Sequence, residues 1–242
     1  MARLFDDASS QRLEINLAVI AAVPLTLACW FRSNDLTVTQ DLIAIADKDV
    51  DTHYFRLIAD GAAVGDPVSA VARGGGTSAI AVTSAGYTAN TWQHACAVFT
   101  SATSRAAFLD GANKGTEATN ATPAGMDRTS IGRLGRLTAT AYMSGEIAEA
   151  AVYSVALADA EVLMLSLGVS PLMVRPDALV AYWPLLGRYS PETDPVGAFD
   201  LTVTGATYAD HPRIIYPRRS RVWQPAAVAA GSLRRLLLLG AG

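Results

Sequence analysis

The sequence has little charge, few aromatic residues and only two cysteines and three histidines among its 242 residues. Charged residues make up 17% and aromatic residues 7% of the chain, whereas apolar residues make up 51%. This balance excludes a chain that is disordered throughout. Two cysteines are too few for a disulfide scaffold or a zinc-binding cysteine cluster. The chain is long enough for one sizeable domain with an appendage.

Long hydrophobic runs are also missing. No uninterrupted apolar stretch reaches the roughly 18 residues of a transmembrane helix, so we predict no membrane span. The start of the chain, Met1 to Asp7, has two acidic residues where a secretory signal would have a basic start followed by a long apolar segment. We therefore expect no signal peptide.

What the sequence does have is many short apolar segments separated by Gly, Pro, Ser and Thr, a pattern typical of strands. In the clearest one, Leu25–Arg32, alternation predicts that Leu25, Leu27, Cys29 and Phe31 face the core and Trp30 the opposite side. Asp110-Gly111 predicts a tight turn. Further strands are expected at residues 13–17, 42–46, 54–61, 68–71, 78–82, 92–99, 105–109, 130–133, 142–153, 179–185 and 199–205.

One helix is expected, over residues 154–168. Asp159 and Glu161 would lie in its first turn, where acidic side chains interact favourably with the helix dipole. Gly168 and Pro171 would end it, since glycine favours the position after a helix and proline cannot continue one.

Several motifs together resemble one family. They are Trp92-Gln93-His94 before an apolar strand, Phe108-Leu109-Asp110-Gly111, Ile131-Gly132-Arg133, and the strands LTLACWFR (25–32) and LVAYWPL (179–185). They are similar to the concanavalin A-like, laminin-G-like jelly-roll family, over roughly residues 1–211. The resemblance implies an all-β, antiparallel β-sandwich with one short helix, in which the strand at 13–17 pairs near the end of the domain. Jelly rolls serve many functions, so the resemblance predicts fold better than activity.

Cys29, Cys96 and His94 all fall in predicted apolar strands. Buried free thiols are the default interpretation of the cysteines, although a disulfide stays open if their strands are neighbours. His94 is interpreted as a packed structural residue, because no nucleophile motif accompanies it.

We predict no enzymatic activity. Glu146 and Glu149 suggest the paired carboxylates of glycosidases, but a spacing of three places them on opposite faces of a strand. The same alternation predicts that Glu149 lies on the same face of the strand as Ile147. Sugar-cleaving relatives of the resembled family carry an E-x-D-x-x-E type of strand, which this chain lacks.

Asp47, Asp49 and Asp51 have a spacing similar to that of calcium-binding loops, without the glycine and distal glutamate of an EF-hand. Some laminin-G-like domains bind calcium. A calcium site at these three residues is therefore kept as a hypothesis, against a solvated acidic loop. No other cofactor is expected.

Charge is unevenly distributed along the chain. All 22 acidic residues lie at or before Asp210, whereas six arginines and no acid follow it. Residues 212–242 are predicted to form an extended basic and apolar arm, because spaced prolines exclude a helix in its first half. Nucleic-acid binding is not expected, since the rest of the chain is acidic. The candidate partner-binding residues of the arm are Arg213, Tyr216, Arg218, Arg219, Arg221, Trp223, Leu236 and Leu237.

Two hypotheses for function follow. The first is a structural protein of a large assembly, formed with protein subunits including copies of itself. The resemblance implies a tailed-phage virion component, decorating the head or building a tail fibre. The alternative is a carbohydrate-binding, lectin-like module that attaches to glycans at a cell surface. The sequence does not distinguish exposed aromatic residues, which would stack on sugars, from those in the core.

Overall fold

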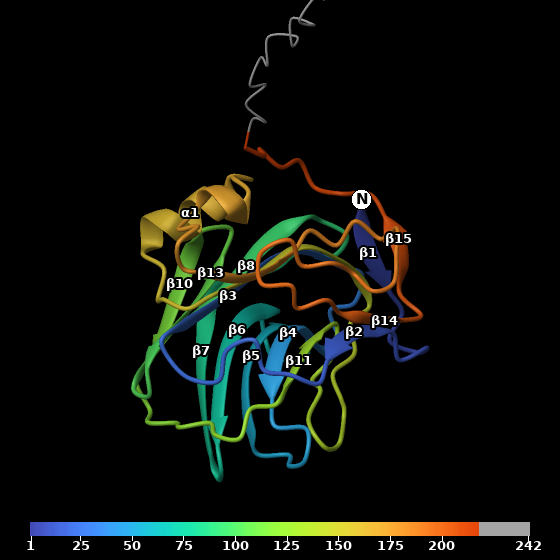
Figure 1. Cartoon of the computed structure of the whole chain (residues 1–242). Coiled ribbons are helices and arrows are strands. Elements are labelled where there is room, and N and C mark those ends of the chain that lie inside the picture. Colours follow the sequence, from blue (N-terminus) through green and yellow to red (C-terminus); the bar gives the residue numbers. More distant parts are fainter. Residues whose placement is uncertain (218–242) are drawn as a thin grey trace, which may run out of the picture.

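The structure is a computed structural model that describes residues 1–217, and it confirms the predicted all-β sandwich of two antiparallel sheets (Figure 1). Sheet A has the strand order β10-β9-β8-β3-β12-β1-β15, with β13 also paired to β12, and sheet B has the order β14-β2-β11-β4-β5-β6-β7. The strands of sheet A are β1 (Ala2–Phe5), β3 (Leu25–Ser33), β8 (Gln93–Ser101), β9 (Ser104–Leu109), β10 (Ala112–Glu117), β12 (Gly145–Tyr153), β13 (Leu179–Trp183) and β15 (Thr207–Ala209). Those of sheet B are β2 (Arg12–Ile15), β4 (Thr39–Ala46), β5 (His53–Asp60), β6 (Pro67–Gly74), β7 (Thr77–Gly86), β11 (Arg128–Ile131) and β14 (Thr202–Thr204).

The main core fills the space between the sheets. Leu25, Leu27, Cys29 and Phe31 all face it, as their alternation predicted. The ring of Phe55 from sheet B meets that of Phe99 from sheet A edge to face, with centroids 5.2 Å apart. A second cluster, the outer cluster, lies between the other face of sheet A and the helical segment.

The two cysteines are free and lie on opposite faces of sheet A. Cys29 belongs to the main core, whereas Cys96 belongs to the outer cluster. Their strands are neighbours, but side chains on opposite faces of a sheet cannot form a disulfide without moving the backbone. Burial raises the pKa of both thiols, so both remain inert apolar side chains.

The N-terminal strands close both sheets. β2 pairs with β14, with Leu13 opposite Val203, as the resemblance implied for the strand at 13–17. β1 was not predicted from the sequence. It lies between β12 and β15 in sheet A.

The helix α1 (Asp159–Ser166) is shorter than predicted, and the 3₁₀ turn η1 (Pro171–Met173) follows it. The segment before it stays extended because Thr26 of β3 binds it. The Thr26 hydroxyl donates to the Val155 carbonyl at 2.8 Å and accepts from the Leu157 amide at 3.1 Å. Gly168, with φ of 83°, ends the helical segment as predicted. Neither α1 nor any other helix within residues 1–217 is long and apolar enough to cross a membrane.

Candidate functional site

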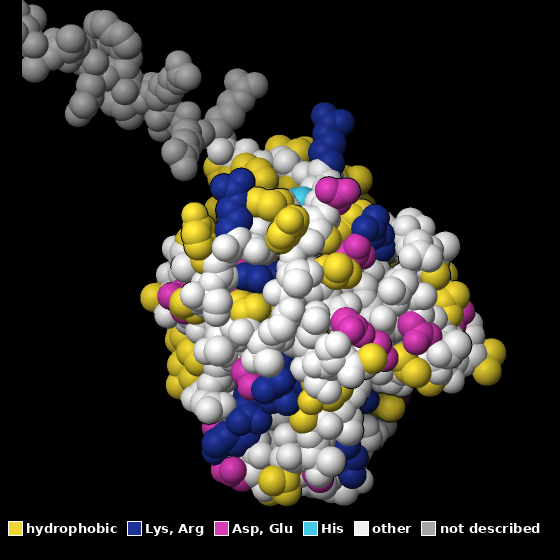
Figure 2. Space-filling model, turned by 90° about the vertical axis from the view of Figure 1, so that its right-hand side faces the viewer, with side chains coloured by type: hydrophobic (Ala, Val, Ile, Leu, Met, Phe, Trp, Pro, Cys, Tyr) yellow, Lys and Arg dark blue, Asp and Glu magenta, His cyan; other side chains and the backbone are white. Residues whose placement is uncertain are grey.

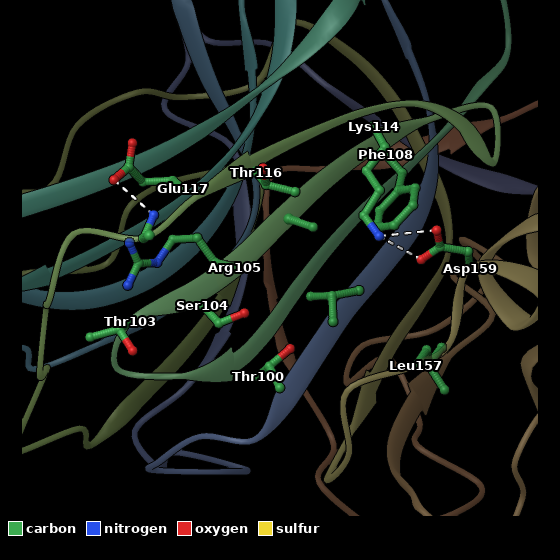
Figure 3. Close-up of a pocket in the computed structure, with 13 residues that line it drawn as sticks. Thr100, Thr103, Ser104, Arg105, Phe108, Lys114, Thr116, Glu117, Leu157 and Asp159 are labelled. Carbon is green, nitrogen blue, oxygen red and sulfur yellow. Dashed lines mark hydrogen bonds and ion pairs between the residues drawn. The ribbon is translucent and has the colours of Figure 1, made fainter.

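An open pocket of about 500 Å³ lies on the outer face of sheet A over β8, β9 and β10 (Figure 3). We call it the β9 pocket. Ala106 lines it and pairs with Val98 of β8 on one side and Thr116 of β10 on the other, and these two residues also line the pocket. Because alanine has no side chain beyond Cβ, the sheet is hollow at this position.

The β9 pocket combines an apolar floor with a hydroxyl rim. Val98, Ala106, Phe108 and Leu157 are buried and form the floor. The rim carries hydroxyl groups from three strands and from the turn between β8 and β9, and Figure 3 shows them around the opening. They belong to Thr100, Thr103, Ser104 and Thr116.

Charged groups stand at the two ends of the pocket. At one end, the Lys114 ammonium contacts both carboxylate oxygens of Asp159, at 2.8 and 3.0 Å, and lies 5.2 Å from the centre of the Phe108 ring. At the other end, the Glu117 carboxylate accepts from the Thr119 amide at 2.7 Å and the Ala118 amide at 2.9 Å. Hydrogen bonding from the Thr119 side chain, and then from the Thr119 and Ala118 amides, lowers the pKa of Glu117.

Arg105 lies beside the Glu117 end and is only 2% exposed. Its Nη2 donates to the Ala102 carbonyl at 2.6 Å, but its Nε and Nη1 have no partner among the described residues. Burial lowers the pKa of Arg105. Two donor atoms of this guanidinium are therefore buried beside the pocket without a protein partner in the described part of the chain.

The predicted three-aspartate calcium site does not form as a unit. Asp47 and Asp49 lie together with Asp127, which precedes β11 and was not predicted, with ligand atoms within 4.8 Å of one another. The Lys48 ammonium contacts Asp49 at 2.7 Å and Asp127 at 2.6 Å, so it already supplies the positive charge that a calcium ion would bring. These residues therefore fit calcium poorly.

Asp51 points to a different loop from Asp47 and Asp49. Its carboxylate accepts from the Thr138 amide at 2.8 Å and hydroxyl at 2.9 Å, and it pairs with Arg136 at 3.3 Å. The hydrogen bonds from Thr138 lower the pKa of Asp51. Asp51 thus fixes a loop instead of joining the other two carboxylates.

The C-terminal strap, residues 211–216, lies against the outer face of sheet A and includes the start of the arm that was predicted over residues 212–242. Ile215 forms a parallel bridge with Val169, its amide donating to the Gly168 carbonyl at 2.7 Å. Tyr216 donates to Glu149 at 2.7 Å, while Arg213 is exposed. The other candidate arm residues lie outside the described residues: Arg218, Arg219, Arg221, Trp223, Leu236 and Leu237.

Glu149 corrects the predicted alternation of β12. Ile147 and Ala150 both face the main core, because the pairing of β12 with β3 shifts between Ala148 and Ala151. Glu149, at φ of 55°, projects instead to the outer face, where Tyr182, Tyr216 and His211 surround it at 2.7, 2.7 and 3.1 Å. A bulge cannot be seen in a sequence that otherwise alternates.

Glu146 and Glu149 do not form a catalytic pair. Glu146 is bonded to Arg32 of β3 in a two-pronged ion pair, and Glu149 is only 2% exposed beneath the strap. His94 is also buried, its ring edge-on to Trp30 at 5.6 Å, and burial lowers its pKa to about 3. A histidine held neutral in this way has the structural role that the sequence predicted.

Comparison with known proteins identifies the family. Residues 7–163 match the model of the family Laminin_G_3, described as the concanavalin A-like lectin/glucanases superfamily. No curated protein matches the chain.

Solved structures share the fold at low identity. A putative carbohydrate-binding protein from Bacteroides ovatus is 18% identical with a TM-score of 0.62, the match covering 88% of this chain and 61% of that protein. A heptameric SAP-like pentraxin from Limulus polyphemus is 13% identical, with a TM-score of 0.54 and coverages of 68% and 81%. The CBM40 of a Ruminococcus gnavus IT-sialidase, bound to α2,3-sialyllactose, is 16% identical, with a TM-score of 0.51 and coverages of 60% and 84%.

Proposed function

Because the chain belongs to the concanavalin A-like lectin/glucanases superfamily, we propose that it is a saccharide-binding domain without catalytic activity, and that a sugar occupies the β9 pocket. The proposal fits a module that attaches to glycans at a cell surface. The named carbohydrate-binding functions of the B. ovatus protein and of the R. gnavus CBM40 support the ligand class.

The composition of the β9 pocket is the observation that carries this proposal. A sugar ring has apolar faces made of C–H groups and an edge of hydroxyl groups. The buried floor around Ala106 and Phe108 matches the first, and the rim of threonine and serine hydroxyls matches the second. Small-molecule sites generally combine an apolar lining with a few placed polar groups in about 300–1,000 Å³, and this pocket has that size.

The Lys114–Asp159 pair adds both donors and acceptors at one end of the floor. Lys114 is 42% and Asp159 64% exposed at the side chain, so both groups can reorient toward a bound hydroxyl. Asp159 also stands in the first turn of α1, which fixes its backbone relative to the sheet.

A glycan array that includes α2,3-sialyllactose and arabinotriose tests the function, and an Ala106→Leu variant tests the site. Leucine at position 106 fills the hollow between Val98 and Thr116, so we expect at least a tenfold loss of affinity for whichever glycan binds. Ser78→Leu, at an exposed position of β7 in sheet B, is the matched control and should bind normally. Equal binding by the Ala106→Leu variant would remove the pocket from the proposal.

A structural role in a large assembly, including a phage particle, is the second candidate. The observation in its favour is the strap, which fixes the root of the arm beside exposed apolar residues of the α1 segment, Leu163, Met164 and Leu167. Light scattering on the full chain and on a chain ending at Pro217, which keeps the strap, tests it. An assembly that forms only with residues 218–242 would support this candidate, and a monomer in both cases would count against it.

A further inference from the structure

A second surface with the chemistry of a saccharide site lies at the opposite edge of sheet A. Tyr189 is 75% exposed and Tyr208 is 70% exposed. Together with Met1, Gly187 and Arg188 they line an open pocket of about 340 Å³, which we call the tyrosine surface. Figure 2 shows this side of the molecule, where hydrophobic side chains reach the surface next to those of Lys and Arg.

The backbone that carries both tyrosines is held by one buried side chain. Arg3 of β1 is 4% exposed and pairs with Glu192, which is 5% exposed, at 2.7 Å. The same guanidinium donates to the carbonyl of Tyr189 itself and, at 3.2 Å, to that of Ala206, two residues before Tyr208. Arg3 is also the residue directly opposite Tyr208 in the pairing of β1 with β15.

Two further contacts bring the tyrosine-bearing segments together. Glu192 also accepts from the Leu186 amide at 2.8 Å, which closes the loop that carries Tyr189. Gly187 lies directly against β15, because a Cβ at this position would stand 2.7 Å from the Cβ of Tyr208. Two exposed rings are thus presented on a backbone fixed by buried polar contacts.

We propose that Tyr189 and Tyr208 form a second saccharide-binding surface, on which sugar rings stack while Arg188 donates hydrogen bonds to their hydroxyl groups. The ligand class rests on the proposed function. A tyrosine ring offers a large apolar face with a polar tip and only two side-chain torsions to immobilise. Tyr189 and Tyr208 line one pocket together, and a contiguous exposed apolar patch marks an interaction site where a single exposed residue does not.

The two surfaces are too far apart for one small sugar. β9 and β15 are separated by five strand intervals in sheet A, which is roughly 24 Å at the usual spacing. A long glycan, or a surface bearing many short ones, can engage both surfaces at once. The domain is therefore bivalent, and its attachment to a glycan-coated surface exceeds the affinity of either site alone.

Isothermal titration and protein NMR with soluble probes test this inference on the full chain. The probes are xylohexaose, cellohexaose, arabinotriose and α2,3-sialyllactose. The proteins are the wild type, Ala106→Leu, and the double variant Tyr189→Ala with Tyr208→Ala, which should fold because both side chains are largely exposed. A Tyr189→Phe, Tyr208→Phe variant keeps the rings and removes only the hydroxyl groups.

We expect two sites per wild-type chain for a bound probe. The alanine double variant should lose one of them, and the affinity of the remaining site, the β9 pocket, should change by less than twofold. The phenylalanine double variant should retain the second site within about threefold, since stacking survives. In Ala106→Leu, the NMR signals of Gly187 and Tyr208 should still move on titration.

One site per chain that vanishes in Ala106→Leu and is unchanged in the alanine double variant would overturn the second surface while leaving the proposed function intact. Failure of the wild type to bind any glycan would overturn the proposed function and this inference together. A change in molecular mass by light scattering in the alanine double variant, without a change in glycan binding, would assign the tyrosines to a protein partner instead.

Discussion

The outer face of sheet A has a covered half and an open half, and the two use polar side chains in opposite ways. Over β3, β12 and β13, the α1 segment, η1 and the strap lie on the sheet, and Glu149 and His94 are buried beneath them. Over β9 and β10, the same face is open and forms the β9 pocket. In the covered half, Glu149 is fully engaged by protein donors, whereas the rim hydroxyls of the open half are available to a ligand.

The difference arises from where the chain crosses the sheet. The segment after β12 turns back as α1 and buries Val162 and Leu165 against the middle of the sheet. The α1 segment does not cover the β9 pocket at the edge of the sheet. It packs closely on the β9–β10 turn because Gly111 has no side chain, and a Cβ at Gly111 would stand 2.8 Å from the Cα of Leu163. Polar groups under the covering segments stabilise the fold, and those beyond it remain free for binding.

The largest expected effect concerns His94 in the covered half. Its pKa is about 3 in the folded state because burial disfavours the charged ring, against about 6.5 when unfolded. Between these two pKa values the unfolded chain binds more protons at His94 than the folded chain does. The contribution of His94 to the free energy of unfolding is therefore fully present above about pH 6.5 and is lost as the pH falls toward 3. The loss is on the order of 5 kcal/mol. Urea denaturation at several pH values measures it.

A His94→Phe variant isolates this contribution, because it keeps a ring of similar shape that does not titrate. The difference in unfolding free energy between wild type and variant should change with pH in this window. Asp41 changes stability in the opposite direction, since burial raises its pKa to about 6 and its proton stabilises the folded state below that pH. It is present in both proteins and cancels in the difference. Parallel pH profiles for the two would show that His94 is not held neutral.

For the covered half, the sequence predicted the secondary structure but not the side-chain contacts. Local backbone preferences decide the strands, the turn at Asp110-Gly111 and the end of the helix at Gly168, so local sequence patterns predict them. Local patterns do not predict that Glu149 points to the outer face, because the bulge in β12 arises from its pairing with β3. Most of the strap was assigned to the extended arm, because its partners Glu149 and Val169 are distant in the sequence.

The open half was less predictable still. Ala106 reads as an ordinary strand residue, and only the register places it between Val98 and Thr116, where its small size leaves a hollow. The exposed tyrosines illustrate the same limit. Tyr189 and Tyr208 look no different in the sequence from Tyr153 and Tyr182, which are buried, because exposure depends on the edge of the sheet at which a residue lies.

The second-largest expected effect on stability follows from removing the Glu149 carboxylate. Glu149→Ala leaves the hydroxyl groups of Tyr182 and Tyr216 without their acceptor beneath the strap, and we expect a loss of about 3 kcal/mol in unfolding free energy. Hydrogen exchange should show earlier opening at Ile215 than elsewhere. Glu149→Gln keeps an acceptor oxygen and should lose clearly less. Equal losses in the two variants would mean that the charge, not the hydrogen bonding, holds the strap.

The smallest effect is expected at the Lys114–Asp159 pair of the open half. Both side chains are substantially exposed, so water screens their attraction, and such pairs contribute about 0.2–1 kcal/mol. A double-mutant cycle with Lys114→Met and Asp159→Asn should give a coupling in this range that decreases at high salt. A coupling as large as the Glu149→Ala loss would contradict the comparison, because a polar pair that stabilises the fold so strongly would not be available to reorient toward a sugar. A weak coupling together with reduced glycan binding in either single variant would instead show that this half of the face is arranged for a ligand.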